Sequence, residues 1–265
     1  MPPRRWHHGP KPARALITGA ARGLGASVAA VLCGENVEVW LADRDGPRLE
    51  VTAAELRRGG GRCHIMAIDL EDVDACHRRF AALEQESGGI DLVLANAAVT
   101  GRRASMGPLE CPWPIARQIM TVNVAGVAAT LWPFVEPMTA RGHGRLAAMS
   151  SLSGDYPNPR TPAYGASKAA VGYLLQSMDI ALRQRGVLAT AIYPGFVATP
   201  GTAEIEDALP MMVHQEAAAR RIVAALRRGR RVVRFPRRLF WMLRMVRTMP
   251  TPIYDRVTRS LTIRG

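Results

Sequence analysis

The stretch Ala15-Leu16-Ile17-Thr18-Gly19-Ala20-Ala21-Arg22-Gly23-Leu24-Gly25 decides the expected fold. Its apolar first half is typical of a buried strand, and the small residues that follow Gly25 favour a helix. Gly19 permits a tight turn off the strand, Gly23 lets a pyrophosphate approach the helix N-terminus, and Gly25 allows close packing of helix on sheet. The pattern predicts a dinucleotide site, while a glycine-rich turn of another α/β protein, including an S-adenosylmethionine enzyme, stays an alternative.

Apolar strands alternate with amphipathic helices along residues 14–236. This spacing is typical of βαβ units, which form a parallel sheet with both faces covered. We therefore predict an α/β fold: a single-domain, Rossmann-like, doubly wound parallel sheet of about seven strands with helices on both faces. Residues 1–13 are expected to form a disordered leader, and residues 237–265 a basic amphipathic C-terminal extension.

Composition argues for an ordinary water-soluble chain: 48% of its 265 residues are apolar and 22% are charged. The apolar runs end well short of eighteen residues, so no transmembrane helix is expected. The N-terminus does not resemble a signal peptide. Four cysteines without CxxC spacing predict reduced thiols, with no disulfide and no metal site. These observations predict a cytoplasmic protein.

The positive charge is concentrated at the C-terminal end. The formal net charge is +13, and residues 217–265 alone carry fourteen arginines and one acid, so the remaining chain is neutral. Within this segment, the apolar and arginine side chains of residues 237–247 separate on a helical wheel, with Leu239, Met242, Leu243 and Val246 on one side. Docking over the substrate pocket or a subunit interface is the favoured role, contact with a membrane surface is the alternative, and nucleic acid is disfavoured because aromatic residues are few.

A second stretch, Ala163-Tyr164-Gly165-Ala166-Ser167-Lys168, carries the expected chemistry. On a helix, Tyr164 and Lys168 lie one turn apart on the same face. A cation in that position favours the phenolate and is expected to lower the pKa of Tyr164 from about 10 towards neutrality. Chance proximity is the alternative, but the chain has 33 arginines and only two lysines, Lys11 and Lys168. An ammonium differs from a guanidinium because it can exchange a proton.

Asp43 follows the second expected strand, eighteen residues after Gly25. A carboxylate there can accept both hydroxyls of an adenosine ribose and would repel a 2′-phosphate. Arg22 and Arg44 instead favour NADP, because either guanidinium could bind that phosphate. On balance the sequence favours NAD over NADP.

Six motifs together resemble the short-chain dehydrogenase/reductase family. They occur in the family's order across residues 15–200: Thr18 to Gly25 (TGxxxGxG), Asn96-Ala97-Ala98 (NAAG, with Val99 in place of Gly), Asn123, Ser151 with Gly154 (SxxG), Tyr164 to Lys168 (YxASK) and Pro194 to Thr199 (PGxxxT). The resemblance implies the fold predicted above and NAD(P)-dependent transfer of a hydride between nicotinamide and a carbonyl or secondary alcohol.

The resemblance also implies roles for particular residues. Tyr164 would be the general acid or base, Lys168 would stabilise the phenolate and bind the nicotinamide ribose, Ser151 would hold the substrate oxygen, and Asn123 would bind a water linking Lys168 to solvent. The implied cofactor-binding residues, besides Tyr164 and Lys168, are Thr18, Gly19, Arg22, Gly23, Leu24, Gly25, Asp43, Arg44, Asp69, Leu70, Asn96, Ala97, Pro194, Gly195, Val197 and Thr199.

The expected substrate pocket is apolar. It would be formed by residues 99–114, 153–162 and 196–212, and its expected apolar side chains are Leu152, Tyr156, Phe196, Leu209, Met211 and Met212. An apolar carbonyl or secondary alcohol is therefore the expected substrate. Small residues along the helix that carries Tyr164 permit close helix packing, and the resemblance implies that this helix pairs between subunits, so we expect a homodimer or homotetramer. The alternatives are a non-catalytic, dinucleotide-binding regulatory protein and a membrane-surface reductase acting on an apolar or lipid substrate.

Overall fold

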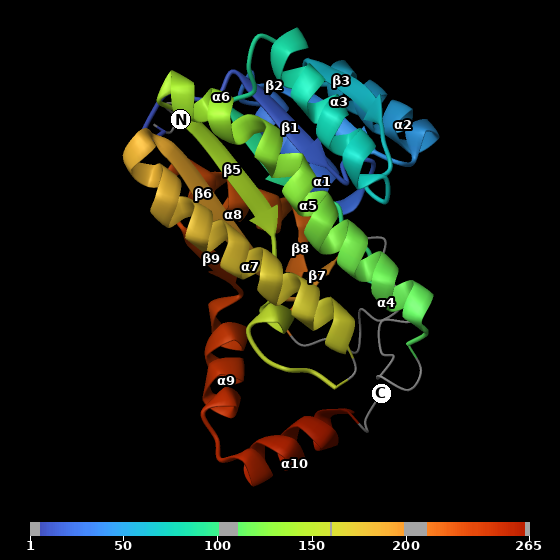
Figure 1. Ribbon diagram of the computed structural model, residues 1–265, viewed down its shortest axis with the longest axis vertical. Helices are drawn as coiled ribbons and strands as arrows, with labels where there is room; N and C mark the ends of the chain where they lie inside the picture. Colours follow the sequence, from blue (N-terminus) through green and yellow to red (C-terminus); the bar gives the residue numbers. More distant parts are fainter. Residues whose placement is uncertain (1–5, 101–110, 160, 199–210, 263–265) are drawn as a thin grey trace.

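The computed structural model describes residues 6–100, 111–159, 161–198 and 211–262. Its central element is a sheet of seven parallel strands in the order β3-β2-β1-β4-β5-β6-β9 (Figure 1). The strands are β1 (Arg14–Thr18), β2 (Glu38–Asp43), β3 (Cys63–Ala67), β4 (Leu92–Ala95), β5 (Gly144–Met149), β6 (Val187–Pro194) and β9 (Val232–Phe235). The predicted doubly wound parallel sheet is therefore confirmed. Strand order reverses between β1 and β4, and a crevice opens at the carboxyl ends of strands at such a point.

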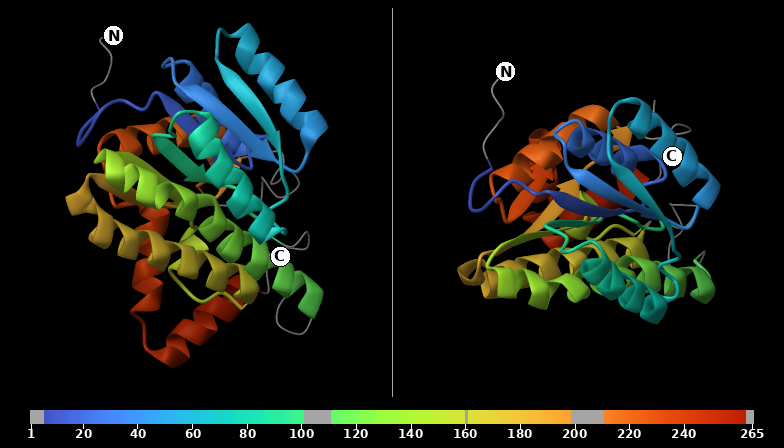
Figure 2. Two further views of the ribbon diagram at one scale, coloured as in Figure 1. Left: turned by 45° about the horizontal axis from the view of Figure 1, so that its top comes forward. Right: turned by 90° about the horizontal axis from the view of Figure 1, so that it is seen from above.

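Helices cover both faces of the sheet, as predicted (Figure 2). One face carries α1 (Gly23–Cys33), α2 (Gly46–Arg58) and α8 (Gln215–Arg227); the other carries α3 (Val73–Glu86), α5 (Gly126–Leu131) and α7 (Pro162–Leu182). The central strands are accordingly buried, β4 at all four of its positions and β5 at all six. The two layers of helices hold the carboxyl ends of the strands at one edge, where the candidate site lies.

Local sequence explains where helices begin. The side chain of Asp45 accepts a hydrogen bond from the Arg48 N–H at 3.1 Å, and Asp72 accepts one from the Ala75 N–H at 3.0 Å. These aspartates cap α2 and α3, because a side-chain oxygen satisfies an N–H that has no partner within the first turn. The two caps therefore set where α2 and α3 begin.

One continuous helical stretch spans Trp113–Arg141 and departs from α-helical pitch at two places. A π-helical turn contains Asn123, and a 3₁₀ turn contains Pro133, which has no N–H to donate within a helix. The segments are α4 (Trp113–Met120), η1 (Thr121–Ala125), α5 (Gly126–Leu131), η2 (Trp132–Phe134) and α6 (Val135–Arg141). By length and composition this stretch could cross a membrane, but 56% of its apolar window is buried inside the molecule, which is usual for a core helix.

The N-terminal segment differs from the expected disordered leader from residue 6 onward. Trp6 is 7% exposed, and its ring lies under the guanidinium groups of Arg145 (4.9 Å) and Arg227 (5.6 Å). The N–H of His7 donates to the Arg227 carbonyl oxygen, and Arg145 donates to the His7 carbonyl. The leader is ordered there because aromatic burial and cation–π contacts offset the entropy of fixing it.

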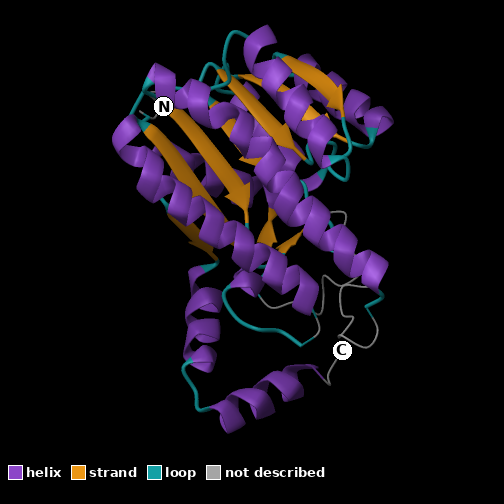
Figure 3. Ribbon diagram, in the orientation of Figure 1, coloured by secondary structure: helices purple, strands orange, loops and turns teal. Residues whose placement is uncertain are grey.

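The C-terminal extension leaves the sheet after β9 as two helices set at an angle to one another (Figure 3). They are α9 (Arg237–Arg247) and α10 (Thr251–Thr262). Leu239 is 4% exposed and packs on the core with Phe240 and Leu243, whereas Met242 is 44% exposed. The structure therefore corrects the predicted helical wheel: Met242 does not share the docked face. The remaining short elements are η3 (Leu152–Gly154), η4 (Arg183–Arg185) and a two-stranded sheet of β7 (Val197–Ala198) and β8 (Val213–His214).

Candidate active site

The glycine-rich turn between β1 and α1 is built on close backbone contacts. Gly19 has a φ of +65° and Gly23 a φ of +61°, in the left-handed region that glycine tolerates. A Cβ on Gly25 would lie 2.2 Å from the Gly19 carbonyl oxygen, so a side chain has no room there. The Asn96 side chain donates to the carbonyl oxygens of Thr18 (3.0 Å) and Gly19 (2.9 Å), which fixes the turn against the end of β4.

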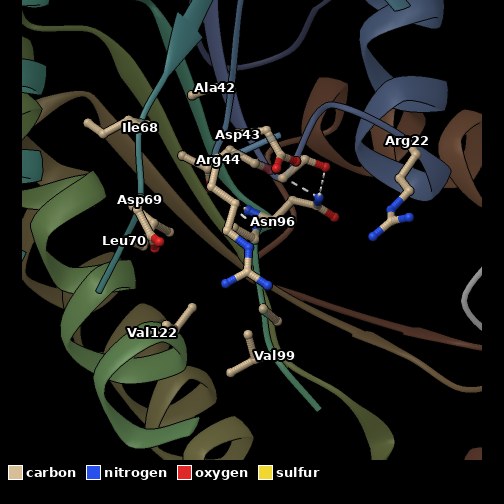
Figure 4. Close-up of a pocket in the computed structure, with 14 residues that line it drawn as sticks. Arg22, Ala42, Asp43, Arg44, Ile68, Asp69, Leu70, Asn96, Val99 and Val122 are labelled. Atoms are coloured by element: carbon tan, nitrogen blue, oxygen red, sulfur yellow. Dashed lines mark hydrogen bonds between the residues drawn. The ribbon is translucent and has the colours of Figure 1, made fainter. Parts of the chain in front are cut away.

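A cavity of about 260 Å³ opens at the carboxyl ends of β1 to β4 (Figure 4). It brings together nine of the predicted cofactor-binding residues: Thr18, Gly19, Arg22, Asp43, Arg44, Asp69, Leu70, Asn96 and Ala97. Ala42, Ile68, Ala98, Val99 and Val122 complete the lining. Gly23, Leu24 and Gly25 begin α1 beside it. Arg22, the N-cap residue, makes no side-chain cap bond, so the first N–H groups of α1 can serve a phosphate. Turn and donors together fit a dinucleotide.

The charged groups of the cavity sit at the ends of β2 and β3. Asp43 accepts hydrogen bonds from the N–H groups of Ala21 (3.2 Å) and Asp45 (3.1 Å), which hold its carboxylate at the mouth. Arg44 extends into the middle of the lining residues and lies 3.8 Å from Glu71, whereas Arg22 lies at the margin (Figure 4). Asp43, which favours NAD, and Arg44, which favours NADP, therefore line the same part of the cavity.

Ser151, Tyr164 and Lys168 meet where β5 ends and α7 begins. Ser151 caps η3, where its Oγ accepts from the Ser153 N–H at 3.1 Å, and it also hydrogen-bonds Tyr164. Lys168 is 2% exposed; its Nζ donates to the Met149 carbonyl oxygen at 2.7 Å and lies 5.7 Å from the centroid of the Tyr164 ring. The spacing of four residues on α7 thus places phenol and ammonium together, as the sequence predicts.

The protonation expected for this pair needs correction. Burial raises the pKa of Tyr164 above its usual value, and the hydrogen bond to Ser151 offsets only part of that rise. Burial also lowers the pKa of Lys168 to about 8. The prediction that Tyr164 has a lowered pKa is wrong for the protein without a dinucleotide, because desolvation is the largest influence on this pKa and raises it. Tyr164 is therefore a protonated phenol at neutral pH.

Asn123 is fully buried in the π-helical turn. Its side chain accepts from the Val99 N–H (2.8 Å), donates to the Val99 carbonyl (2.9 Å) and donates to Ser167 Oγ (3.1 Å). Ser167 Oγ in turn donates to the Tyr164 carbonyl. Asn123 therefore fixes the backbone of Val99, the residue at the position of the motif's glycine, and connects it to α7 through Ser167. The water link between Lys168 and solvent stays a prediction.

The residues after β6 serve a packing role in the structure. A Cβ on Gly195 would lie 2.8 Å from Leu239 on α9 and 3.3 Å from Leu152. Pro194 ends β6, and Val197 begins β7. Thr199 lies outside the described residues. The close approach at Gly195 lets the C-terminal extension reach the segment that follows Ser151.

Sequence reasoning missed a polar cluster beside the site. Arg234 on β9 makes two hydrogen bonds to the Asp155 carboxylate (2.8 and 3.2 Å), and its guanidinium lies between the rings of Tyr193 (4.4 Å) and Phe240 (4.9 Å). Arg247 donates to the Asp155 carbonyl oxygen. These partners are 79 and 92 residues apart, and no local spacing signals them.

Comparison with known proteins places the chain among oxidoreductases. The family model described as short chain dehydrogenase matches residues 13–210. An uncharacterized oxidoreductase of Myxococcus xanthus is 36% identical over 93% of this chain and 96% of its own length. The 2-dehydro-3-deoxy-L-rhamnonate dehydrogenase (NAD(+)) of a Sphingomonas species (strain SKA58) is 32% identical over 74% of this chain and 75% of its length.

A solved structure agrees. The short-chain dehydrogenase from Sphingobium yanoikuyae in complex with NADPH is 25% identical and superposes with a TM-score of 0.76, covering 84% of this chain and 87% of that one. This chain therefore belongs to the short-chain dehydrogenase family and is an NAD(P)-dependent oxidoreductase. The resemblance stated from the six motifs is confirmed.

Proposed function

We propose that the protein interconverts an apolar carbonyl compound and its secondary alcohol, with Tyr164 as general acid and base. The supporting observation is the contact of the Ser151 and Tyr164 hydroxyls beside the buried ammonium of Lys168. A nicotinamide dinucleotide, when bound, supplies or accepts the hydride. The protein supplies position and the proton.

The protonation states favour proton donation in the reducing direction. A phenol with a raised pKa holds its proton at neutral pH and can give it to a carbonyl oxygen as charge develops there. Ser151 donates to the same oxygen and holds it in line. Lys168, with a pKa of about 8, is mostly cationic at pH 7 and stabilises the phenolate that the transfer leaves. In the oxidising direction, the Tyr164 phenolate accepts the proton of the alcohol hydroxyl.

We infer a preference for NAD from Asp43. Its carboxylate is held at the cavity mouth by two backbone N–H groups, and a 2′-phosphate placed there would be repelled. Among the relatives, the Sphingomonas enzyme is named for NAD(+), and the Sphingobium structure holds NADPH. Fluorescence titration with NADH and NADPH tests the inference. The inference is supported if wild type binds NADH more tightly than NADPH and the difference between the two affinities is smaller in Asp43→Ser. It is overturned if wild type binds NADPH more tightly.

The C-terminal extension forms one wall of the proposed substrate pocket. Tyr254 Oη donates to the Pro157 carbonyl at 2.7 Å, and Arg247 donates to that of Asp155, so both helices hold the segment that follows Ser151. A cavity of about 50 Å³ remains between this segment and α9. Of the predicted pocket residues, Tyr156 lines this cavity. Phe196, Met211 and Met212 are at least partly exposed, and Leu209 lies outside the described residues.

The proposed reaction is tested by screening. Wild type and Ser151→Ala are assayed against cyclic and aromatic ketones and their alcohols with both cofactors, following absorbance of the reduced nicotinamide. We expect turnover of apolar substrates, with kcat reduced about a hundredfold in Ser151→Ala. Tight NADH binding without turnover of any substrate would favour the regulatory alternative instead.

We also propose a homodimer or homotetramer formed through α7 and the neighbouring Trp113–Arg141 stretch. Tyr173 (79%) and Ile180 (66%) on α7, and Trp132 (52%), are large apolar side chains left exposed. Light scattering of wild type and Ile180→Glu tests this: an oligomer that the substitution dissociates supports the interface, and a monomeric wild type excludes it. The cytoplasmic location stays a prediction from the sequence.

A further inference from the structure

The outward side of α9 is apolar. While Leu239, Phe240 and Leu243 pack on the body, the opposite side of the helix exposes a row of large apolar side chains. These form the outward face, defined as Trp241 (58% exposed), Met242 (44%) and Met245 (67%). Their spacing of three and four residues places them on one side of the helix. Figure 1 shows α9 and α10 standing away from the sheet and its covering helices.

Arginines surround the outward face. Arg237, Arg238 and Arg244 are exposed, and no carboxylate of the described residues lies within 4.0 Å of them. They belong to the extension of residues 237–265, which carries seven arginines and one acid, a net charge of +6. The extension therefore combines exposed apolar side chains with a positive field.

The charge decides among the occupants that could cover this face. In a symmetric dimer the same patch would meet itself, which would bring the three arginines of each copy against those of the other. A partner with negative charge and an apolar interior fits better. An anionic bilayer provides both, because phosphates accept the planar fork of arginine while tryptophan and methionine enter the boundary between headgroups and acyl chains.

We propose that the outward face of α9 docks on the surface of a membrane that contains anionic phospholipid. This inference goes beyond the proposed function, since it holds for either cofactor and either direction of the reaction. It also has a consequence for the site. Arg247 and Tyr254 connect the same two helices to the segment after Ser151, so a docked molecule would hold its substrate pocket close to the lipid.

Vesicle co-sedimentation of the full chain tests the proposal. Vesicles of phosphatidylcholine alone are compared with vesicles containing 30 to 40 mol% phosphatidylglycerol, on the order of the anionic content of natural membranes. Two variants probe the two components of binding: Trp241→Ser with Met245→Ser, and Arg237→Gln with Arg238→Gln and Arg244→Gln. Val51→Ser is the matched control, because Val51 is similarly exposed (45%) but lies on α2, away from α9 and from the proposed subunit interface. Far-UV circular dichroism and NADH binding show that each variant is folded.

We expect wild type and Val51→Ser to bind the anionic vesicles and to be released by salt. Each arginine near an anionic leaflet contributes about fivefold, so the triple variant should bind about a hundredfold more weakly. The variant Trp241→Ser with Met245→Ser, called the apolar variant because it removes apolar side chains, should bind the same vesicles at least about tenfold more weakly.

Three results would overturn the proposal. The first is a wild type that does not bind anionic vesicles. The second is binding that survives the apolar substitutions unchanged, which would indicate non-specific attraction by the basic segment. The third is loss of self-association in the apolar variant without any vesicle binding by wild type, which would assign the face to a second copy of the chain. NADH turnover is measured separately, so the result of the vesicle-binding test does not depend on whether the protein is catalytically active.

Discussion

Replacing Lys168 by methionine tests whether the fold carries a costly buried cation. Lys168 is 2% exposed, and burial lowers its pKa from 10.5 to about 8. At 1.36 kcal/mol per pKa unit, keeping the proton at pH 7 costs the folded protein roughly 3 kcal/mol. Methionine removes this cost but leaves the Met149 carbonyl without its donor, which costs about 1 kcal/mol. Lys168→Met should therefore raise the free energy of unfolding by roughly 2 kcal/mol at pH 7.

The pH dependence gives the test its sign. Between pH 8 and pH 10.5 the unfolded chain holds the lysine proton while the folded protein has released it, so the stability of wild type rises with pH. The variant lacks this gain, and its advantage over wild type should shrink by roughly 2 kcal/mol from pH 7 to pH 10. Urea unfolding without cofactor, followed by circular dichroism, measures both values.

Lys11, the other lysine of the chain, supplies the control. It is exposed, so Lys11→Met should change stability by less than about 0.5 kcal/mol at either pH. The reasoning is refuted if Lys168→Met is less stable than wild type at pH 7, or if the difference between the two proteins does not change with pH.

Three further substitutions test the cofactor turn and the walls of the site. Gly25→Ala places a Cβ 2.2 Å from the Gly19 carbonyl oxygen, so NADH binding should weaken at least about tenfold by fluorescence titration; unchanged binding would contradict the predicted role of the turn. Asn123→Ala breaks both hydrogen bonds to Val99 and should lower the free energy of unfolding by about 2 kcal/mol in urea; a loss below about 0.5 kcal/mol would mean that the clamp is dispensable. Asp155→Asn weakens a partly exposed ion pair, so we expect a loss of about 1 kcal/mol in stability, with KM changed more than kcat; the reverse pattern in steady-state kinetics would argue against a pocket-wall role.

The part of the fold that local sequence encodes could be predicted. The turn between β1 and α1 depends on glycines within seven residues, and its positive φ angles and close contacts are those that the spacing requires. Tyr164 and Lys168 meet because one helix places residues four apart on one face. The seven strands and their parallel direction follow from apolar runs that alternate with amphipathic helices, whereas the register between strands is set by pairing of distant residues.

What could not be predicted depends on contacts between distant residues or on burial depth. Trp6 is ordered by Arg145 and Arg227, which lie 139 and 221 positions away in the sequence. Arg234 and Arg247 reach Asp155 only once β9 and α9 are in place. The pKa of Tyr164 could not be predicted for a related reason, because it depends on how deeply the side chain is buried in the folded protein.

The central claim is that the Tyr164 hydroxyl transfers the proton, and single-turnover kinetics of Tyr164→Phe test it most directly. The variant loses one oxygen and keeps the ring, so NADH affinity should stay within about threefold of wild type, while oxidation of bound NADH by a ketone substrate should slow by about a thousandfold. A Tyr164→Phe protein that oxidises NADH at the wild-type rate would contradict the account.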